Sequence, residues 1–178
     1  MSLAPVGLTP TQLEMAAIIE REFRAAGLPP VLAAAAIVNA WYESRLNPNA
    51  VGDGGHSIGL FQLNDRGAGA GMSVEARRDP AQNTRRIIEV VQGSYGAAVR
   101  AAAAGGESLE RVTQLFTYHI ERPADKEKKS AERGAGAARF FPAGIGTTFF
   151  SGRVLVGVSL VTLALIGGAY ALRSRLNV

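Results

Sequence analysis

Apolar residues run almost without interruption from residue 30 to residue 46, a stretch longer than a strand needs. Proline stands at the start of this run, in the first helical turn, where proline is favoured. Asn47–Pro48 follows the run, and a proline pushes the residue before it out of the α region. The pattern therefore predicts a helix over residues 30–46 that is buried on most of its circumference.

Three further helices are predicted by apolar spacing and by capping residues at their starts. They span about residues 10–26, 80–99 and 108–120. Gly93 and Gly96 weaken the second of them, each at a cost of about 1 kcal/mol against alanine. We therefore expect a mainly α domain in which this helix is either broken or closely packed near its middle.

Changes in composition predict the domain boundaries. Residues 125–133 alternate in charge sign, which is typical of a solvated helical face, and residues 134–152 are mostly small or aromatic, which indicates a linker region. We accordingly expect an N-terminal tail at 1–8, a helical domain at 9–141 and a linker at 142–153.

Residues 154–172 carry no charged side chain, and their 19 residues approach the ~20 that cross a bilayer as a helix. Arg153 and Arg173 bracket the segment, and aromatic residues lie near its ends. The alternative is a central helix of a soluble core, but the charges at both ends disfavour it. The sequence thus predicts a C-terminal transmembrane helix of undecided orientation, followed by a short basic tail at 173–178.

Composition limits the kinds of metal site and partner that we expect for this chain. The chain has no cysteine, and its two histidines, His56 and His119, lack the spacing of a zinc pair, so we expect no metal and no cofactor. The net charge of +4 suits nucleic acid, anionic lipid or a phosphate-bearing cell envelope without choosing among them. Since the charge run at 125–133 reads as a solvated face, no nucleic-acid partner is expected. The N-terminus lacks the basic start and apolar core of a secretory signal, so no export by such a signal is expected.

Glu43 is the carboxylate around which the chemistry is organised. It falls in the final turn of the helix predicted over residues 30–46, on the same face as Asn39. The negative end of the helix dipole and the apolar flank of Trp41 and Tyr42 both disfavour an ionised carboxylate there. Such a group could stay protonated near neutral pH and act as a general acid. The alternative is that Glu43 pairs with Arg45, Arg66 or another arginine and simply holds the following loop.

Several ordered elements around Glu43 resemble the lysozyme-like superfamily, in particular soluble lytic transglycosylases, goose-type lysozymes and phage tail lysozymes. Those families carry a catalytic Glu followed by Ser, an Asn-Pro-x-Ala segment, a Gly-rich loop and Gly-Leu-(Met/Phe)-Gln. A later segment, residues 120–125, is similar to one in the phage tail enzymes. The matching stretches here are Glu43–Ser44, Leu46–Ala50, Gly52–Gly55 and Gly59–Gln62.

The resemblance implies that Glu43 is the acid/base residue and that Gly59–Gln62 lines a saccharide groove. Asp53 is a plausible match for a second acidic residue, but Asn64 stands where a further carboxylate is expected, so a second catalytic carboxylate stays open. Tyr118 either lies in the groove or packs in the core. The residues expected to bind substrate are Ser44, Asp53, Gly59, Leu60, Phe61, Gln62, Asn64 and Tyr118.

The implied function is cleavage of the β-1,4 bond between N-acetylmuramic acid and N-acetylglucosamine in peptidoglycan, by lytic transglycosylation or by hydrolysis. The expected partners are glycan strands, a lipid membrane through residues 154–172, and other virion proteins. The expected place is a virion, in an internal membrane or in the tail and ejection apparatus, with the host inner membrane as the alternative. The competing interpretation is a membrane-anchored structural or glycan-binding virion protein whose lysozyme-like domain is inactive.

Overall fold

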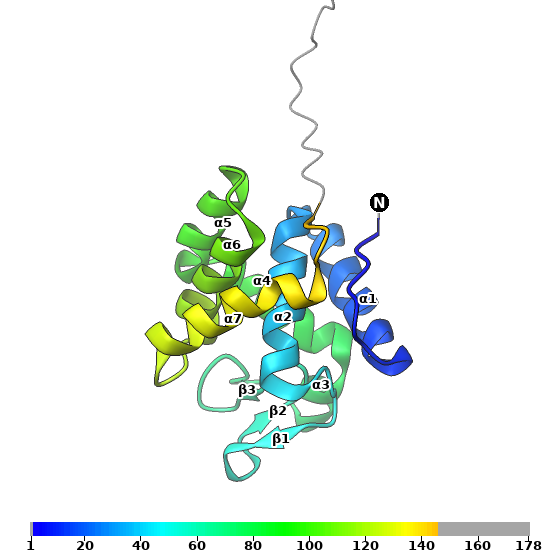
Figure 1. Ribbon diagram of the computed structural model, residues 1–178. Coiled ribbons are helices and arrows are strands. Elements are labelled where there is room, and N and C mark those ends of the chain that lie inside the picture. Colours follow the sequence, from blue (N-terminus) through cyan, green and yellow to red (C-terminus); the bar gives the residue numbers. More distant parts are fainter. Residues whose placement is uncertain (1, 146–178) are drawn as a thin grey trace, which may run out of the picture. The chain divides into compact units, whose positions relative to one another are not determined.

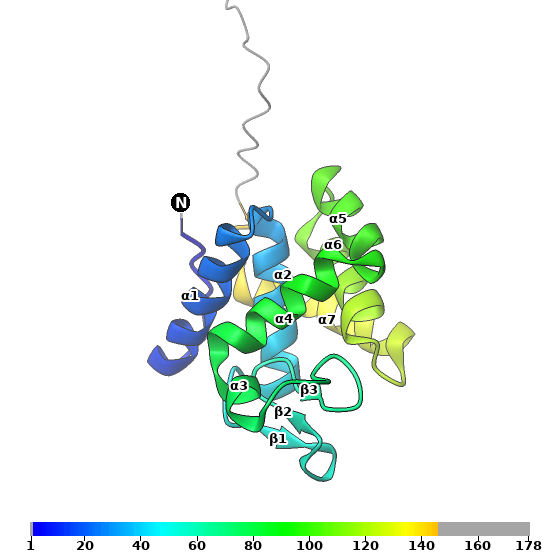
Figure 2. The same cartoon turned by 180° about the vertical axis from the view of Figure 1, so that it is seen from behind.

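Helix α2 (Pro30–Ser44) runs through the middle of the domain, with other helices on several sides of it (Figures 1 and 2). The computed structural model describes residues 2–145, which form a mainly α-helical domain. Every residue from Val31 to Ala40 is buried, so the helix is covered on most of its circumference, as predicted. The helix ends at Ser44 rather than Leu46.

Helix α1 (Pro10–Ala25) packs along α2 and opens with the capping signal that the sequence predicted. The Thr9 hydroxyl accepts a hydrogen bond from the Gln12 amide, and the Gln12 side chain accepts one from the Thr9 amide at 2.9 Å. This reciprocal pairing satisfies two amides that the start of a helix leaves free.

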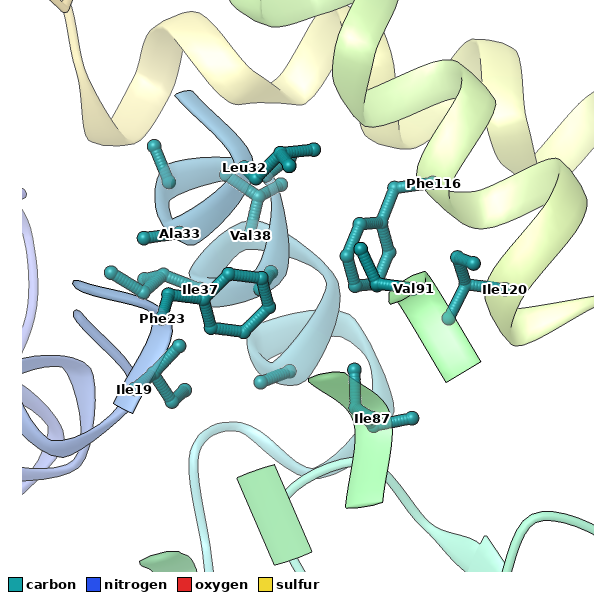
Figure 3. Close-up of a cluster of buried hydrophobic side chains, with 14 of the residues drawn as sticks. Ile19, Phe23, Leu32, Ala33, Ile37, Val38, Ile87, Val91, Phe116 and Ile120 are labelled. Atoms are coloured by element: carbon teal, nitrogen blue, oxygen red, sulfur yellow. The ribbon is translucent and has the colours of Figure 1, made fainter. Parts of the chain in front are cut away.

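The core lies where α1, α2, α4 (Pro80–Gln92) and α6 (Leu109–Phe116) meet (Figure 3). Phe23 and Phe116 are fully buried and approach Ile37 and Val91 from different helices. Burying a side chain of this size stabilises a fold by about 1.5–3 kcal/mol. This packing fixes the direction of α2 and therefore the place at which it ends.

The helix predicted over residues 80–99 is both broken and closely packed. Asp79 caps α4 by accepting a hydrogen bond from the Gln82 amide at 2.7 Å. A 3₁₀ turn, η2 (Ser94–Gly96), then separates α4 from α5 (Ala97–Ala104). A Cβ atom on Gly96 would lie 1.7 Å from the Val91 carbonyl oxygen, so a residue without a side chain is needed at this contact.

Helix α6 continues into a π-helical turn, η3 (Thr117–Glu121), before the chain reverses into α7 (Lys126–Phe140). Helix α7 corrects two expectations. Ser130 and Arg133 are buried, so the segment at 125–133 is not a wholly solvated face. Residues 134–140 continue the helix, and Phe140 and Phe141 belong to the core, so the linker region does not begin at residue 134. Packing against α6 and α2 explains both corrections.

A small antiparallel sheet follows α2, and the sequence did not predict it. Its strands are β1 (Val51–Gly52), β2 (Ser57–Ile58) and β3 (Leu63–Asn64), with β2 in the middle. A 3₁₀ turn, η1 (Asp53–Gly55), joins the first two strands, and the short helix α3 (Val74–Arg78) leads from the sheet into α4. Strands of two residues carry too little alternation to be recognised from sequence.

The N-terminal segment at 2–8 lies on the domain: the Leu3 amide donates to the Glu20 carboxylate at 3.0 Å, and the Val6 amide to the Phe140 carbonyl at 2.9 Å. Between residues 2 and 145 no helix has both the length and the apolar character needed to cross a membrane. The transmembrane helix and the basic tail predicted at 154–178 lie outside the described residues, as does most of the predicted linker.

Candidate active site

Glu43 lies at the end of α2, where the chain turns sharply away. Arg45 and Leu46 both adopt a left-handed conformation with φ of 58°, and this pair ends the helix before Asn47–Pro48 is reached. The Arg45 amide still bonds the Trp41 carbonyl, at 2.9 Å. The Glu43 side chain is 21% exposed, so it is held by the domain and yet accessible from outside.

A buried cation holds Glu43. Arg133 Nη2 lies 2.7 Å from Glu43 Oε1, and Arg133 Nη1 donates to Asn39 Oδ1 at 3.1 Å. The Thr117 hydroxyl donates to the same Asn39 oxygen at 2.8 Å, and Asn39 Nδ2 donates to the Ala35 carbonyl at 2.9 Å. The structure therefore confirms that Glu43 contacts an arginine, which was the alternative that the sequence left open. The partner is neither Arg45 nor Arg66 but a residue that the sequence placed on a solvated face.

A second acid, Glu121, lies in the same neighbourhood on η3. Its Oε1 atom is buried and has no hydrogen-bond partner among residues 2–145. Burial raises the pKa of Glu121 well above its usual range, the charge of Glu43 raises it further, and Arg133 opposes both. Sequence reasoning did not name Glu121 as a site residue; its only signal was its place in the 120–125 segment that resembles the phage tail enzymes.

The segment after Glu43 is tied back to α2. The Ser44 hydroxyl lies 2.8 Å from the Leu60 carbonyl and 3.1 Å from the Ala40 carbonyl. Leu60 and Phe61 are buried and belong to the core. Ser44, Leu60 and Phe61 therefore position the segment through its backbone, and the side chains of Leu60 and Phe61 do not form an open surface.

Asn83 of α4 fixes the same segment from the other side. Its Oδ1 accepts from the Phe61 amide at 3.1 Å, while its Nδ2 donates to the carbonyls of Ile58 at 3.2 Å and Arg77 at 2.7 Å. Gly59 lies between these contacts with φ of 87°. A Cβ atom there would be 2.1 Å from the Arg77 carbonyl oxygen, so Gly59 permits a close backbone approach. Sequence reasoning missed Asn83, which is buried in the first turn of α4.

The phage tail lysozyme family model matches residues 14–143, which include Glu43, Glu121 and Arg133. The chain belongs to the phage tail lysozyme family. Its resemblance to the lysozyme-like superfamily is thereby confirmed, and family membership implies peptidoglycan degradation in a phage context. No curated protein and no solved structure matches the chain.

In this member of the phage tail lysozyme family, Gln62 turns inward. It has φ of 45°, and its Nε2 donates to the carbonyls of Ala50 at 3.2 Å and Gly59 at 3.1 Å. A Cβ atom on Gly52 would meet Gln62 Oε1 at 2.5 Å. Gln62 thus braces the loop between β1 and β3 from within.

Asp53 and Asn64 are joined through Ser57 at the sheet of this lysozyme domain. The Ser57 hydroxyl donates to Asp53 Oδ2, and Asn64 Nδ2 donates to the Ser57 oxygen at 3.2 Å. Asp53 is exposed on the Gly-rich turn, with φ of 48°. The two polar positions expected at the groove are thus brought together, with a hydroxyl between them.

Tyr118 faces a different part of the lysozyme domain from the Glu43 network. Its ring packs edge-on against His119, 5.0 Å between centroids, and Lys126 Nζ lies 4.4 Å from the ring centre. Tyr118 and His119 border a hollow of about 340 Å³ between α6 and α7. In the π turn η3, Thr117 bonds Asn39, and Glu121 lies where the charge of Glu43 acts on it. Tyr118 stands between them in the chain and borders the hollow instead.

His56 forms a polar cluster beside the sheet of the lysozyme domain. Its Nδ1 lies 3.1 Å from Asp65 Oδ1, and Arg66 Nη2 lies 3.1 Å from its Nε2. The hydrogen bond with His56 lowers the pKa of Asp65. Among the described residues, 2–145, no group of three acidic or histidine side chains could hold a metal ion.

Proposed function

We propose that the chain is a peptidoglycan glycosidase that cleaves the bond between N-acetylmuramic acid and N-acetylglucosamine, with Glu43 as its general acid and base. The observation that carries this proposal is the contrast at the end of α2. The Glu43 carboxyl is partly exposed, whereas Arg133, which holds it, and Asn39, which holds Arg133, are buried. An accessible acid in a fixed position suits proton transfer to a bound substrate.

The chemical step begins with Glu43 donating its proton to the leaving glycosidic oxygen. The resulting carboxylate then acts as a base. It takes a proton either from the muramyl 6-hydroxyl, which gives an anhydro product, or from a water molecule, which gives a hydrolysed end. In this proposal the backbone of the segment at 59–62, held by Ser44 and Asn83, forms one wall of the glycan site, and Asp53, Ser57 and Asn64 form its polar edge.

The test compares the full chain with Glu43→Gln on purified peptidoglycan. Glutamine keeps the shape of the side chain and removes its transferable proton, so release of soluble glycan should fall at least ~100-fold. Glu132→Gln, an exposed glutamate on α7, is the matched control and should keep wild-type activity. A folded Glu43→Gln protein within a few-fold of wild type would refute the assignment. Mass spectrometry of the products, read for the anhydro end, separates transglycosylation from hydrolysis.

A second candidate function is glycan binding without cleavage. The Glu43–Arg133 ion pair favours it, because structural ion pairs also occupy buried carboxylates. Sedimentation with insoluble peptidoglycan separates the candidates: binding without release of any muropeptide by the wild-type chain supports the second and contradicts the first.

We further propose that the protein acts from a virion, anchored in a membrane by residues 154–172. The family's phage context supports the virion part, and the uncharged segment supports the anchor. Placing arginine at Leu163, near the middle of the segment, should cost about 2.5–3.5 kcal/mol on insertion scales. Leu163→Arg should therefore move the full chain from the membrane fraction toward the soluble fraction, with Ala143→Arg as the control. Equal partitioning of both variants would contradict the anchor.

A further inference from the structure

Trp41 lies against two arginines where the last turns of α2 and α7 meet. The Cζ atom of Arg45 lies 3.6 Å from the centre of the Trp41 ring, and the Cζ atom of Arg139 lies 5.0 Å from it. Phe140 packs on the same indole, with 5.2 Å between the ring centres. Because the face of an indole attracts a guanidinium, this one ring gathers two cations at one place on the surface.

The domain does not balance the charge of these two arginines. Both side chains are exposed, and among residues 2–145 no carboxylate pairs with either guanidinium, whereas Arg85 and Arg133 each have one. Two like charges beside one ring repel each other, and a bound anion relieves that repulsion. A guanidinium matches the geometry of a phosphate with two parallel hydrogen bonds. Arg45 and Arg139 are therefore suited to bind phosphate groups.

Apolar side chains border the two cations. Trp41 is partly exposed, and Val6, whose amide bonds the Phe140 carbonyl at 2.9 Å, is 47% exposed. Tryptophan is enriched where a protein meets the headgroup level of a bilayer, and arginines there are attracted to anionic lipid. The structure thus brings phosphate-binding and apolar groups together on what we call the Trp41 surface, made of Val6, Trp41, Arg45 and Arg139.

The Trp41 surface is separate from the proposed catalytic acid. Trp41 and Glu43 are two residues apart on a helix of 3.6 residues per turn, so their side chains leave α2 on roughly opposite sides. Their contacts agree with this: Glu43 pairs with Arg133 in the middle of α7, whereas Trp41 contacts Arg139 in its last turn. A partner bound at the Trp41 surface therefore does not cover Glu43.

We propose that the Trp41 surface binds the phosphate headgroups of an anionic lipid bilayer. The choice of a bilayer rests on the membrane anchor proposed above for residues 154–172. Val154 stands fourteen positions after Phe140, so a bilayer that holds the anchor stays within about 50 Å of this surface along the chain. The two arginines bind lipid phosphate, while Trp41 and Val6 reach the boundary between headgroups and acyl chains.

The first experiment uses Trp41 as its own probe, because the chain contains a single tryptophan. Full-length wild type and Leu163→Arg are mixed with vesicles that contain brominated lipid, either phosphatidylcholine alone or phosphatidylcholine and phosphatidylglycerol in equal parts. The anionic vesicles should quench the Trp41 fluorescence of both proteins, and salt should reduce the quenching of Leu163→Arg because it screens the lipid charge. No quenching by anionic vesicles, or equal quenching of Leu163→Arg by both kinds of vesicle, would overturn the proposal.

The second experiment substitutes the arginines in the full chain that carries Leu163→Arg. Adding Arg139→Gln should weaken binding to the anionic vesicles about fivefold, and adding Arg45→Gln as well should weaken it about 20-fold. Arg139→Lys keeps the charge and should retain most of the binding. Arg78→Gln removes the same charge from an exposed position on α3, so it is the matched control and should bind as the parent does. Equal weakening by Arg139→Gln and Arg78→Gln would contradict the proposal.

Two comparisons separate this inference from the proposed function. Glu43→Gln should keep the quenching by anionic vesicles, and Arg139→Gln should keep the wild-type release of soluble glycan from lipid-free peptidoglycan. If Glu43→Gln stays active while anionic vesicles quench Trp41, the proposed glycosidase role fails and the lipid-binding surface stands. If soluble peptidoglycan fragments change the Trp41 fluorescence and anionic vesicles do not, the surface binds glycan and the lipid inference fails.

Discussion

Arg133 Nη2 lies 2.7 Å from Glu43 Oε1 and joins the end of α2 to the middle of α7. The same guanidinium bonds Asn39, one turn before Glu43 on α2. Its side chain is 7% exposed, so solvent does little to screen the contact. The position of the proposed catalytic acid therefore depends on α7 as much as on the helix that carries it.

The first prediction removes this cation. In Arg133→Met, Glu43 loses its ion-pair partner and Glu121 loses the cation that opposes the rise of its pKa. Breaking a buried pair in this way costs about 3–5 kcal/mol near neutral pH. Without the cation the pKa of Glu121 rises further in the folded protein, so the loss should be small below about pH 4 and grow as pH rises. Urea unfolding at pH 4 and pH 7 measures this. Lys129→Met on the same helix is the control, and a deficit that does not depend on pH would contradict the charge argument.

The second prediction concerns the wild-type pH dependence. Burial, with the Glu43 charge added, raises the pKa of Glu121 in the folded state above the value of about 4.3 in the unfolded chain. A group of this kind contributes its full stability below the unfolded pKa, and that contribution is lost as pH rises toward the folded pKa. The unfolding free energy of Glu121→Gln should therefore fall less between pH 5 and pH 8 than that of the wild type. Parallel curves would show that Glu121 titrates normally.

The third prediction separates steric closeness from backbone conformation at two glycines. Gly59 and Gly54 both have positive φ, 87° and 64°, but only the first has backbone where a Cβ atom would be placed. Gly54→Ala should cost about 1 kcal/mol, the penalty for a left-handed alanine. Gly59→Ala should cost at least about 3 kcal/mol more, because the Arg77 carbonyl and Asn83 must move. Equal losses in thermal unfolding would mean that the segment at 58–61 relaxes freely.

The fourth prediction concerns the exposed acid of the Gly-rich turn. Asp53 accepts from the Ser57 hydroxyl, and asparagine can accept the same bond. If the enzyme is a transglycosylase, Asp53→Asn should change the rate only a few-fold and leave anhydro products. We expect this mild outcome because Asn64 occupies the other position where a carboxylate was sought. A loss of ~100-fold, with hydrolysed ends in the wild type, would instead assign Asp53 the role of positioning water.

The sequence by itself determined the features that depend on neighbouring residues. The apolar run predicted α2, the capping residues predicted the starts of α1 and α4, and the two glycines predicted that the helix from residue 80 is either broken or closely packed before α5. All these signals act within about four residues along the chain, which is the range of helical hydrogen bonds and caps. The ordered motifs around Glu43 likewise predicted the family, because they lie together in one stretch.

Only the tertiary structure decided which charges meet. The alternation of charges at 125–133 gives every charged residue there the same apparent role, but packing of α7 on α6 and α2 buries Arg133 and leaves its neighbour Glu132 exposed. Glu121 likewise comes under the influence of Glu43 and Arg133 only in the folded protein, because η3 packs against α7. Leu60 and Phe61, expected at the groove, became core residues because Asn83 and Ser44 hold their backbone against the helices. Ion pairs and burial of this kind depend on contacts between distant segments, which local patterns do not encode.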